Sequence, residues 1–81
     1  MSRYSTTSKW SAEKISAAAQ DYFGEKGLGL KNTSQDDCCL SYTGGGGYVS
    51  ITIKENNGKN YVELDVSEWD NHIASFLRKI N

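Results

Sequence analysis

The sequence predicts an α+β fold: a two-layer sandwich, in the order α-β-β-β-β-α, with an antiparallel meander that carries both helices on one face. Apolar residues alternate with polar ones through residues 38–43 and 48–66, as in strands buried on one side. Glycine-containing turns at 44–47 and 57–58 divide this stretch into hairpins. The flanking segments carry apolar residues at three- and four-residue steps, which is typical of amphipathic helices.

Size and charge limit the function classes. The chain has 81 residues, of which 37% are hydrophobic and 23% charged, so we expect a single domain over residues 1–81 with a thin core. The formal net charge is -1, which argues against a nucleic-acid partner or a membrane surface bound by bulk electrostatics. The same weak charge leaves self-association open, because identical chains repel each other little.

Residues 1–9 are polar and rich in Ser and Thr, and we expect a loose N-terminal arm, with a short strand at Tyr4–Thr6 as the alternative. They contain no apolar leader segment, and no stretch of the chain is apolar enough to span a membrane. We therefore expect a cytoplasmic protein with reduced thiols. Its two cysteines, Cys38 and Cys39, are adjacent, and adjacent strand residues point to opposite faces, which places them poorly for bridging each other.

The first helix is predicted to follow a cap at Ser8 or Ser11 and to end near Gly24 or Gly27. One apolar stripe marks its buried side. The stripe consists of Ala12, Ile15, Ala18, Ala19, Tyr22 and Phe23.

The dipeptide Asn57-Gly58 predicts a two-residue type I′ turn, because both of its central positions need positive φ. Such a turn fixes the register of the two strands that it joins. The expected apolar pairs are Ile53–Val62, Ile51–Leu64 and Val49–Val66. The polar residues then pair on the opposite face, and a slip by one residue would destroy both matches.

A second hairpin is predicted at Gly44–Gly47, with a loop of two or four residues centred between Gly45 and Gly46. The core-face pairs are then Tyr42–Val49, Leu40–Ile51 and Cys38–Ile53. A further strand near Leu28–Asn32, joined through a turn at residues 34–36, would place Leu28 and Leu30 on the core face.

The last helix is predicted to be capped by Ser67, with Asp70 three residues further on. Arg78 and Lys79 stand at its C-terminal end, where cations suit the helix dipole. Its apolar stripe consists of Trp69, Ile73, Phe76, Leu77 and Ile80.

Three local patterns could carry chemistry, and each has a simpler structural interpretation. The Gly44–Gly47 run lacks the ending of a phosphate-binding loop and suits a hairpin tip, although four glycines exceed what a turn needs. The excess indicates a mobile tip or a close backbone approach. Cys39 could be a reactive thiol, but Cys38 and Cys39 with one histidine are too few ligands for zinc. Glu68 and His72, four residues apart, could form an acid–base pair, or could simply be polar residues at a helix start.

The outer face of the sheet is the most informative surface. It carries Cys39, Ser41, Thr43, Tyr48, Ser50, Thr52, Lys54, Tyr61, Glu63 and Asp65. Exposed tyrosines on a sheet can stack RNA bases, but one lysine against two carboxylates is the wrong balance for phosphates. Small hydroxyl side chains with two tyrosines fit a flat protein–protein contact, and a simply solvated face is the alternative.

The leading hypothesis is a non-enzymatic binding or protein-interaction module, self-associating through the outer sheet face or an edge strand. The residues expected to bind a partner or ligand are Tyr48, Tyr61, Thr52, Cys39, Gly45, Gly46, Trp69 and Tyr22. The alternative is a small apolar ligand bound between sheet and helices, near Tyr22, Trp69 and Tyr42. A third is an enzyme using Cys39 or the Glu68/His72 pair. We predict no catalytic residue, metal or cofactor, and no motif identifies a substrate or partner.

Overall fold

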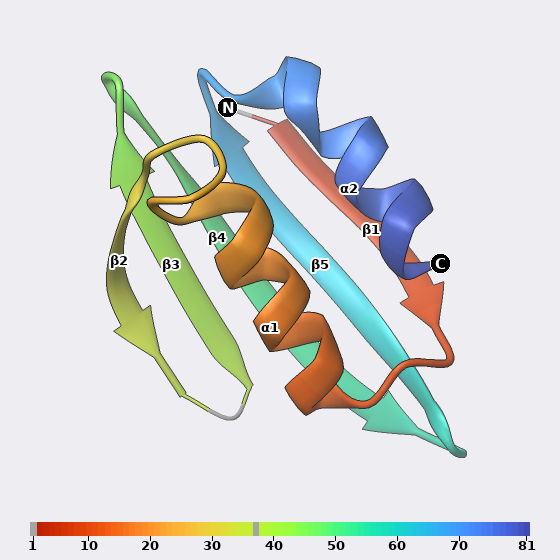
Figure 1. Cartoon of the computed structure of the whole chain (residues 1–81). Coiled ribbons are helices and arrows are strands. Elements are labelled where there is room, and N and C mark those ends of the chain that lie inside the picture. The colour runs from red at the N-terminus through yellow and green to blue at the C-terminus, as the bar shows by residue number, and fades with distance from the viewer. Residues whose placement is uncertain (1, 37) are drawn as a thin grey trace.

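A computed structural model describes residues 2–36 and 38–81. It has the predicted α+β architecture: an antiparallel sheet of five strands with two α-helices packed on one of its faces (Figure 1). The strands lie in the order β1-β5-β4-β3-β2. In chain order the elements are β1 (Ser2–Ser8), α1 (Ala12–Phe23), β2 (Lys31–Gln35), β3 (Cys39–Gly44), β4 (Gly47–Asn56), β5 (Lys59–Ser67), a 3₁₀ turn η1 (Asp70–His72) and α2 (Ile73–Ile80).

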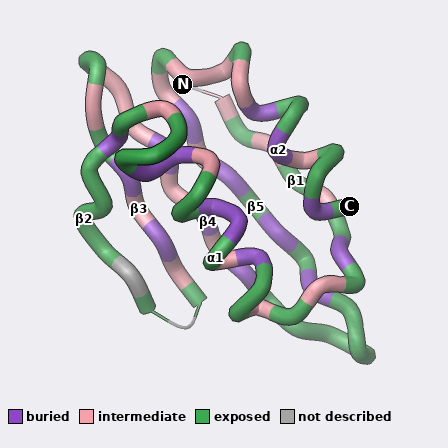
Figure 2. Tube along the Cα trace, in the orientation of Figure 1, coloured by how far each residue is buried: buried purple, intermediate pink, exposed green. Residues whose placement is uncertain are grey.

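The central ladder has the predicted register. Ile53 pairs with Val62, Ile51 with Leu64 and Val49 with Val66. All six side chains are buried, and they form the floor of the core. Asn57 and Gly58 both have positive φ, 55° and 79°, as the two-residue turn requires. Buried residues alternate with intermediate ones along β4, and with exposed or intermediate ones along β5 (Figure 2).

The second hairpin also has the predicted register, with Tyr42 opposite Val49 and Leu40 opposite Ile51. Its loop is the two-residue turn Gly45-Gly46, whose φ angles are 59° and 83°. A Cβ atom on Gly45 would lie 2.6 Å from the Trp69 ring, and one on Gly47 would lie 2.0 Å from the Ser67 carbonyl oxygen. A Cβ atom on Gly44, the other glycine outside the two-residue turn, would lie 2.8 Å from Leu30 Cδ2. The two glycines beyond those the turn needs, Gly44 and Gly47, are therefore explained by close approach, the second of the two expectations.

The N-terminal segment corrects the expectation of a loose arm over residues 1–9. Ser2–Ser8 form β1, which pairs along β5 from Ser2 opposite Val66 to Ser8 opposite Asn60. This is the strand alternative at Tyr4–Thr6, extended in both directions. The pattern missed it because Ser2, Thr6 and Ser8 occupy inward positions without being apolar, so no hydrophobic alternation marks the strand. Residue 1 lies outside the described part of the chain.

The first helix begins and ends as predicted. The Ser11 side chain accepts a hydrogen bond from the Lys14 N–H at 3.2 Å, so Ser11 and not Ser8 is the cap. Ser8 is buried instead: its hydroxyl donates to the Ile80 carbonyl and accepts from the Trp10 N–H. Ser8 thus joins β1 to the end of α2.

The strand expected at Leu28–Asn32 begins later, at Lys31. After α1 the chain folds back on the helix end, and the N–H groups of Leu28 and Leu30 donate to the carbonyls of Tyr22 and Phe23. Leu28 and Leu30 still pack on the core as expected, but from this loop. The strand also contains a register shift between Asn32 and Ser34. The turn expected at residues 34–36 is wrong for its first two residues, because β2 continues through Gln35.

The last helix corrects two further expectations. Ser67 ends β5 and caps nothing, because the 3₁₀ turn η1 and then α2 begin after it, without a side-chain cap. Asp70, expected in a capping box, accepts a hydrogen bond from the Tyr4 hydroxyl at 2.7 Å and so ties η1 to β1. The predicted stripe is buried at Ile73, Phe76 and Ile80.

The two helices meet over the centre of the sheet. The Phe23 and Phe76 rings lie 4.9 Å apart by centroid, and Phe23 also lies 5.9 Å from Tyr42 on the sheet. The buried core is one cluster drawn from both helices and from strands β3, β4 and β5. One face of the sheet is therefore filled by the helix layer.

Replacing Gly47 by Ala is expected to lower the free energy of unfolding by about 3 kcal/mol, because the added methyl group meets backbone atoms that cannot move aside easily. Gly46→Ala is the matched control. It meets nothing within 4 Å and bears only the strain of its positive φ, so we expect a loss of about 1 kcal/mol. Urea unfolding measures both. A larger loss for Gly46→Ala would contradict the close contact at Gly47.

The Asp70 contact makes stability depend on pH. Hydrogen bonds from the hydroxyls of Ser2 and Tyr4 hold the pKa of Asp70 below its ordinary value of 3.8. A lowered carboxyl pKa stabilises the fold above the unfolded-state pKa, and this stabilisation is lost as the pH falls through the folded-state pKa.

Asp70→Asn should therefore flatten the fall in melting temperature below about pH 4, as should Tyr4→Phe in smaller measure. Asp21→Asn on the exposed side of α1 is the control for losing one carboxylate. If the melting temperature of Asp70→Asn falls at low pH as steeply as that of the wild type, the contact contributes nothing to the pH dependence.

Candidate functional site

The face of the sheet opposite the helices is the first candidate surface. Over the described ranges, both helices lie on one face and no element covers the other (Figure 1). All ten residues that the sequence assigned to this face lie on it, through the β3–β4 and β4–β5 registers. Strands β1 and β2 enlarge it. By register they add Arg3, Ser5, Thr7, Lys31 and Ser34.

The two tyrosines of this face do not form one aromatic cluster. Tyr48 pairs with Ser67 at one end of the β4–β5 ladder, and Tyr61 pairs with Lys54 at the other. Six residues of β4 separate the two ends, a distance of about 20 Å. Tyr61 is 42% exposed, and Tyr48 is partly covered. Thr52, paired with Cys39 on β3, lies between them. The face is thus a hydroxyl-rich surface with an aromatic ring toward each end.

Its charge balance differs from the one expected. The sequence placed only Lys54 against Glu63 and Asp65, but β1 and β2 bring Arg3 and Lys31 to the same face. Arg3 Nε lies 2.9 Å from the Asp65 carboxylate. The face is therefore close to neutral and carries both signs, with one cation already engaged by a neighbouring anion.

The cysteines correct another expectation. Cys38 and Cys39 are joined by a disulfide, with Cα atoms 3.7 Å apart. The prediction treated both as strand residues with opposed side chains, but Cys38 precedes β3 and is exposed. Cys38 therefore does not occupy the expected core position opposite Ile53, although its carbonyl accepts the Ile53 N–H at 2.7 Å. In this form Cys39 presents no free thiol.

Glu68 and His72 do not share a helix turn, as the acid–base hypothesis assumed. Glu68 lies between β5 and η1 with a φ of 74°, and His72 ends η1. The His72 ring lies 5.7 Å from the Trp69 ring by centroid. The hypothesis used the four-residue spacing of Glu68 and His72, which brings two side chains together only if a helix runs continuously from residue 68.

The aromatic residues proposed to orient an apolar ligand have different roles. The Tyr22 hydroxyl donates to the His72 carbonyl at 3.0 Å, and Trp69 Nε1 donates to the Gly44 carbonyl at 2.9 Å. Trp69 also covers Gly45, whereas Gly46 is open. The polar groups of Tyr22 and Trp69 thus hold the fold together, whereas the Tyr42 hydroxyl has no hydrogen-bond partner among the residues that the structure describes.

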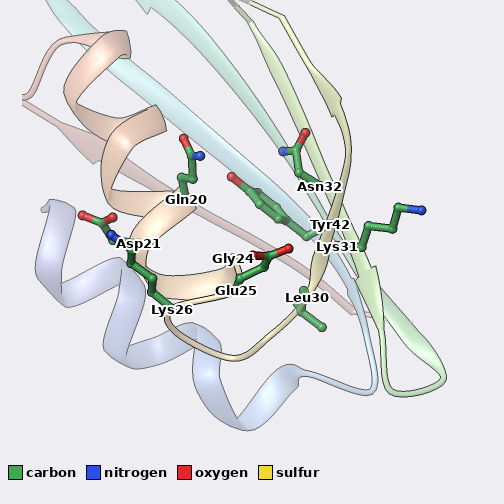
Figure 3. Close-up of a pocket in the computed structure, with 9 residues that line it drawn as sticks. All are labelled: Gln20, Asp21, Gly24, Glu25, Lys26, Leu30, Lys31, Asn32 and Tyr42. Atoms are coloured by element: carbon green, nitrogen blue, oxygen red, sulfur yellow. The ribbon is translucent and has the colours of Figure 1, made fainter.

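Tyr42 contributes to a groove of about 550 Å³ between the end of α1 and strand β2 (Figure 3). The side chain is fully buried, yet within the described residues its hydroxyl has no hydrogen-bond partner. Burial raises the pKa of this hydroxyl, and the Asn32 side chain lies near enough to oppose that shift, although it does not meet the geometry of a hydrogen bond to Tyr42. The groove is lined by Gln20, Asp21, Gly24, Glu25, Lys26, Leu30, Lys31, Asn32 and Tyr42.

Sequence reasoning missed this groove, although one signal pointed to it. Tyr42 is the tyrosine among the predicted inward positions of the meander, and a buried tyrosine hydroxyl normally finds a partner. The other lining residues come from the end of α1 and from a strand whose start was misplaced. Their convergence depends on how the loop after α1 folds back.

No protein-family model matches the chain, and no curated protein matches its sequence. Neither helix in the described part of the structure is long and apolar enough to cross a membrane. Among residues 2–36 and 38–81, no three side chains of the His, Cys, Asp or Glu types gather where they could hold a metal ion.

Replacing Tyr42 by Phe should raise the free energy of unfolding by about 1 kcal/mol, because it removes a buried polar group without removing a hydrogen bond. Tyr22→Phe is the matched control. It removes the same atom from a tyrosine that is hydrogen-bonded, and should lower the free energy of unfolding by about 1 kcal/mol. Denaturant unfolding of both variants measures the contrast. Equal losses in the two would mean that the Tyr42 hydroxyl is satisfied within the fold.

Proposed function

We propose that this chain is a non-enzymatic protein-interaction domain whose outer sheet face binds a second copy of the chain. The observation that carries the proposal is the uncovered face itself, which bears small hydroxyl side chains and two tyrosines. A solvated sheet face usually carries polar and charged side chains, whereas the centres of protein interfaces are depleted of charged residues and enriched in tyrosine.

The dimensions of the face fit this use. Its two central strands have 10 and 9 residues. At about 3.3 Å per residue and about 4.8 Å between strands, the face is about 20 Å wide and about 30 Å long at its centre. It is shorter along β1, β2 and β3, which have 7, 5 and 6 residues. Its area approaches the ~800 Å² that each partner contributes to an interface of standard size.

The charges favour an identical partner over a strongly acidic or basic one. A contact between two copies about a twofold axis presents the same patch twice, so that patch must contain both signs. Lys54 lies on β4, and Glu63 and Asp65 lie on the neighbouring β5. A twofold arrangement can therefore set Lys54 of each copy against the carboxylates of the other.

Sedimentation velocity across a concentration series tests the proposal. The wild-type chain should move from monomer toward dimer as its concentration rises, and Tyr48→Ser with Tyr61→Ser should remain monomeric. Ala17→Ser with Ala74→Ser, at exposed positions of α1 and α2, is the control on the helix layer and should dimerise like wild type. A wild-type chain that stays monomeric up to about 1 mM would contradict self-association through this face.

A further inference from the structure

We propose that the groove between α1 and β2 is a binding site for a small neutral polyhydroxylated molecule, a monosaccharide or a polyol, and that the Tyr42 hydroxyl contacts it. This site is separate from the outer sheet face. It lies at the edge of the helix layer, on the other side of the sheet (Figure 3).

The Tyr42 hydroxyl is the feature that points to a ligand. Its ring packs against Phe23 in the core, and a phenylalanine would supply the same contact without a polar atom. The fold provides protein partners for the polar atoms of Tyr22 and Trp69, which pack against the same core, but none among the described residues for Tyr42. A buried polar atom without a partner is unfavourable, and such atoms mark places where another molecule completes the hydrogen bonding.

The groove residues indicate what kind of molecule fits. Gln20 and Asn32 carry amides that both donate and accept hydrogen bonds, as the Tyr42 hydroxyl does. Glu25 and Asp21 add carboxylate acceptors that disfavour an anion, and Lys26 is the cation on their side of the sheet, because the Lys31 side chain points away from Tyr42 toward the outer face (Figure 3). A ligand hydroxyl also donates and accepts at once, so a neutral molecule with several hydroxyls matches this set better than either a phosphate or an amine.

The volume of the groove and the position of Asn32 both agree with such a ligand. A volume of about 550 Å³ lies within the range of small-molecule sites and exceeds the needs of a single sugar ring. Asn32 is opposite Tyr42 in the β2–β3 register, at the residue where that register shifts, and its side chain is exposed. A ligand hydroxyl can therefore reach Tyr42 by displacing one exposed amide on an edge strand.

Titration followed by ¹H–¹⁵N correlation spectra tests this site with five separate probes: D-glucose, D-galactose, D-mannose, D-ribose and myo-inositol. We expect at least one to shift the amide signals of Gln20, Glu25, Asn32 and Tyr42 together. Tyr42→Phe should weaken the binding of that probe at least tenfold, which corresponds to the loss of about one hydrogen bond to a buried group. Tyr22→Phe is the matched control and should bind it as wild type does.

Three outcomes would overturn the proposal. The first is that none of the five probes shifts these signals up to about 50 mM, as expected if only water meets the hydroxyl. The second is equal binding by wild type and Tyr42→Phe. The third is a response to sodium phosphate or glycine alone, which would assign the groove to a charged ligand.

Two further variants separate this proposal from the others. Asn32→Ala, at an exposed position, should change the affinity for the probe without unfolding the chain. The Tyr48→Ser and Tyr61→Ser double variant should keep the sugar response even though it no longer dimerises. Failure of one proposal therefore leaves the other to be judged by its own result.

Discussion

The ladder between β4 and β5 is the constraint on which the rest of the structure depends. A two-residue turn at Asn57-Gly58 leaves one register, in which Ile51 and Leu64 face the helices while Thr52 and Glu63 face away. Both candidate surfaces follow from that register. The inner side becomes a floor that recruits the helix layer, and the outer side collects the hydroxyl groups, because side chains alternate strictly along a strand.

Side-chain hydrogen bonds between the strands and the less regular segments then hold the layers together. Tyr4 reaches Asp70, Trp69 reaches the Gly44 carbonyl, and the Asn60 amide donates to the Trp10 carbonyl at 2.7 Å. Each of these contacts links a strand or hairpin to a segment next to a helix. Tyr42 differs from them, since its hydroxyl has no such link among the residues that the structure describes. The contrast singles out the groove, because the fold supplies hydrogen-bond partners for comparable polar groups elsewhere.

The central hairpins and the apolar helix stripes were predictable because each depends on a local sequence pattern. Turn residues that adopt positive φ and the strict alternation of apolar residues define the hairpins, and apolar residues three and four positions apart define the helices. The errors arose where tertiary contacts override pattern. Ser2, Thr6 and Ser8 form part of a strand because β5 offers an unpaired edge, although none of them is apolar. Helix α2 starts at Ile73, later than the Ser67 signal indicated, because Trp69 is engaged with the glycine hairpin.

The candidate sites divide in the same way. The residues of the outer face were predictable, because they are the ones that alternate with the apolar residues along each strand. The near-neutral charge of the face was not predictable, since Arg3 and Lys31 come from strands that the sequence pattern missed or misplaced. The groove could not be assembled from sequence, because Gln20 and Asn32 meet only through the loop after α1. One buried tyrosine was its single local sign.

The contact between Ser8 and the Ile80 carbonyl has a consequence for synthesis. It joins the first strand to the last helix across 72 positions of sequence, and β1 pairs with the last strand of the chain. A nascent chain can close its glycine and Asn-Gly hairpins as they emerge, since those contacts are local. The first strand, however, has no partner until β5 has left the ribosome, and its tie to the helix waits for α2. Strand β1 therefore has to wait for elements that follow it in the chain, and the hairpins between them can form before it is placed.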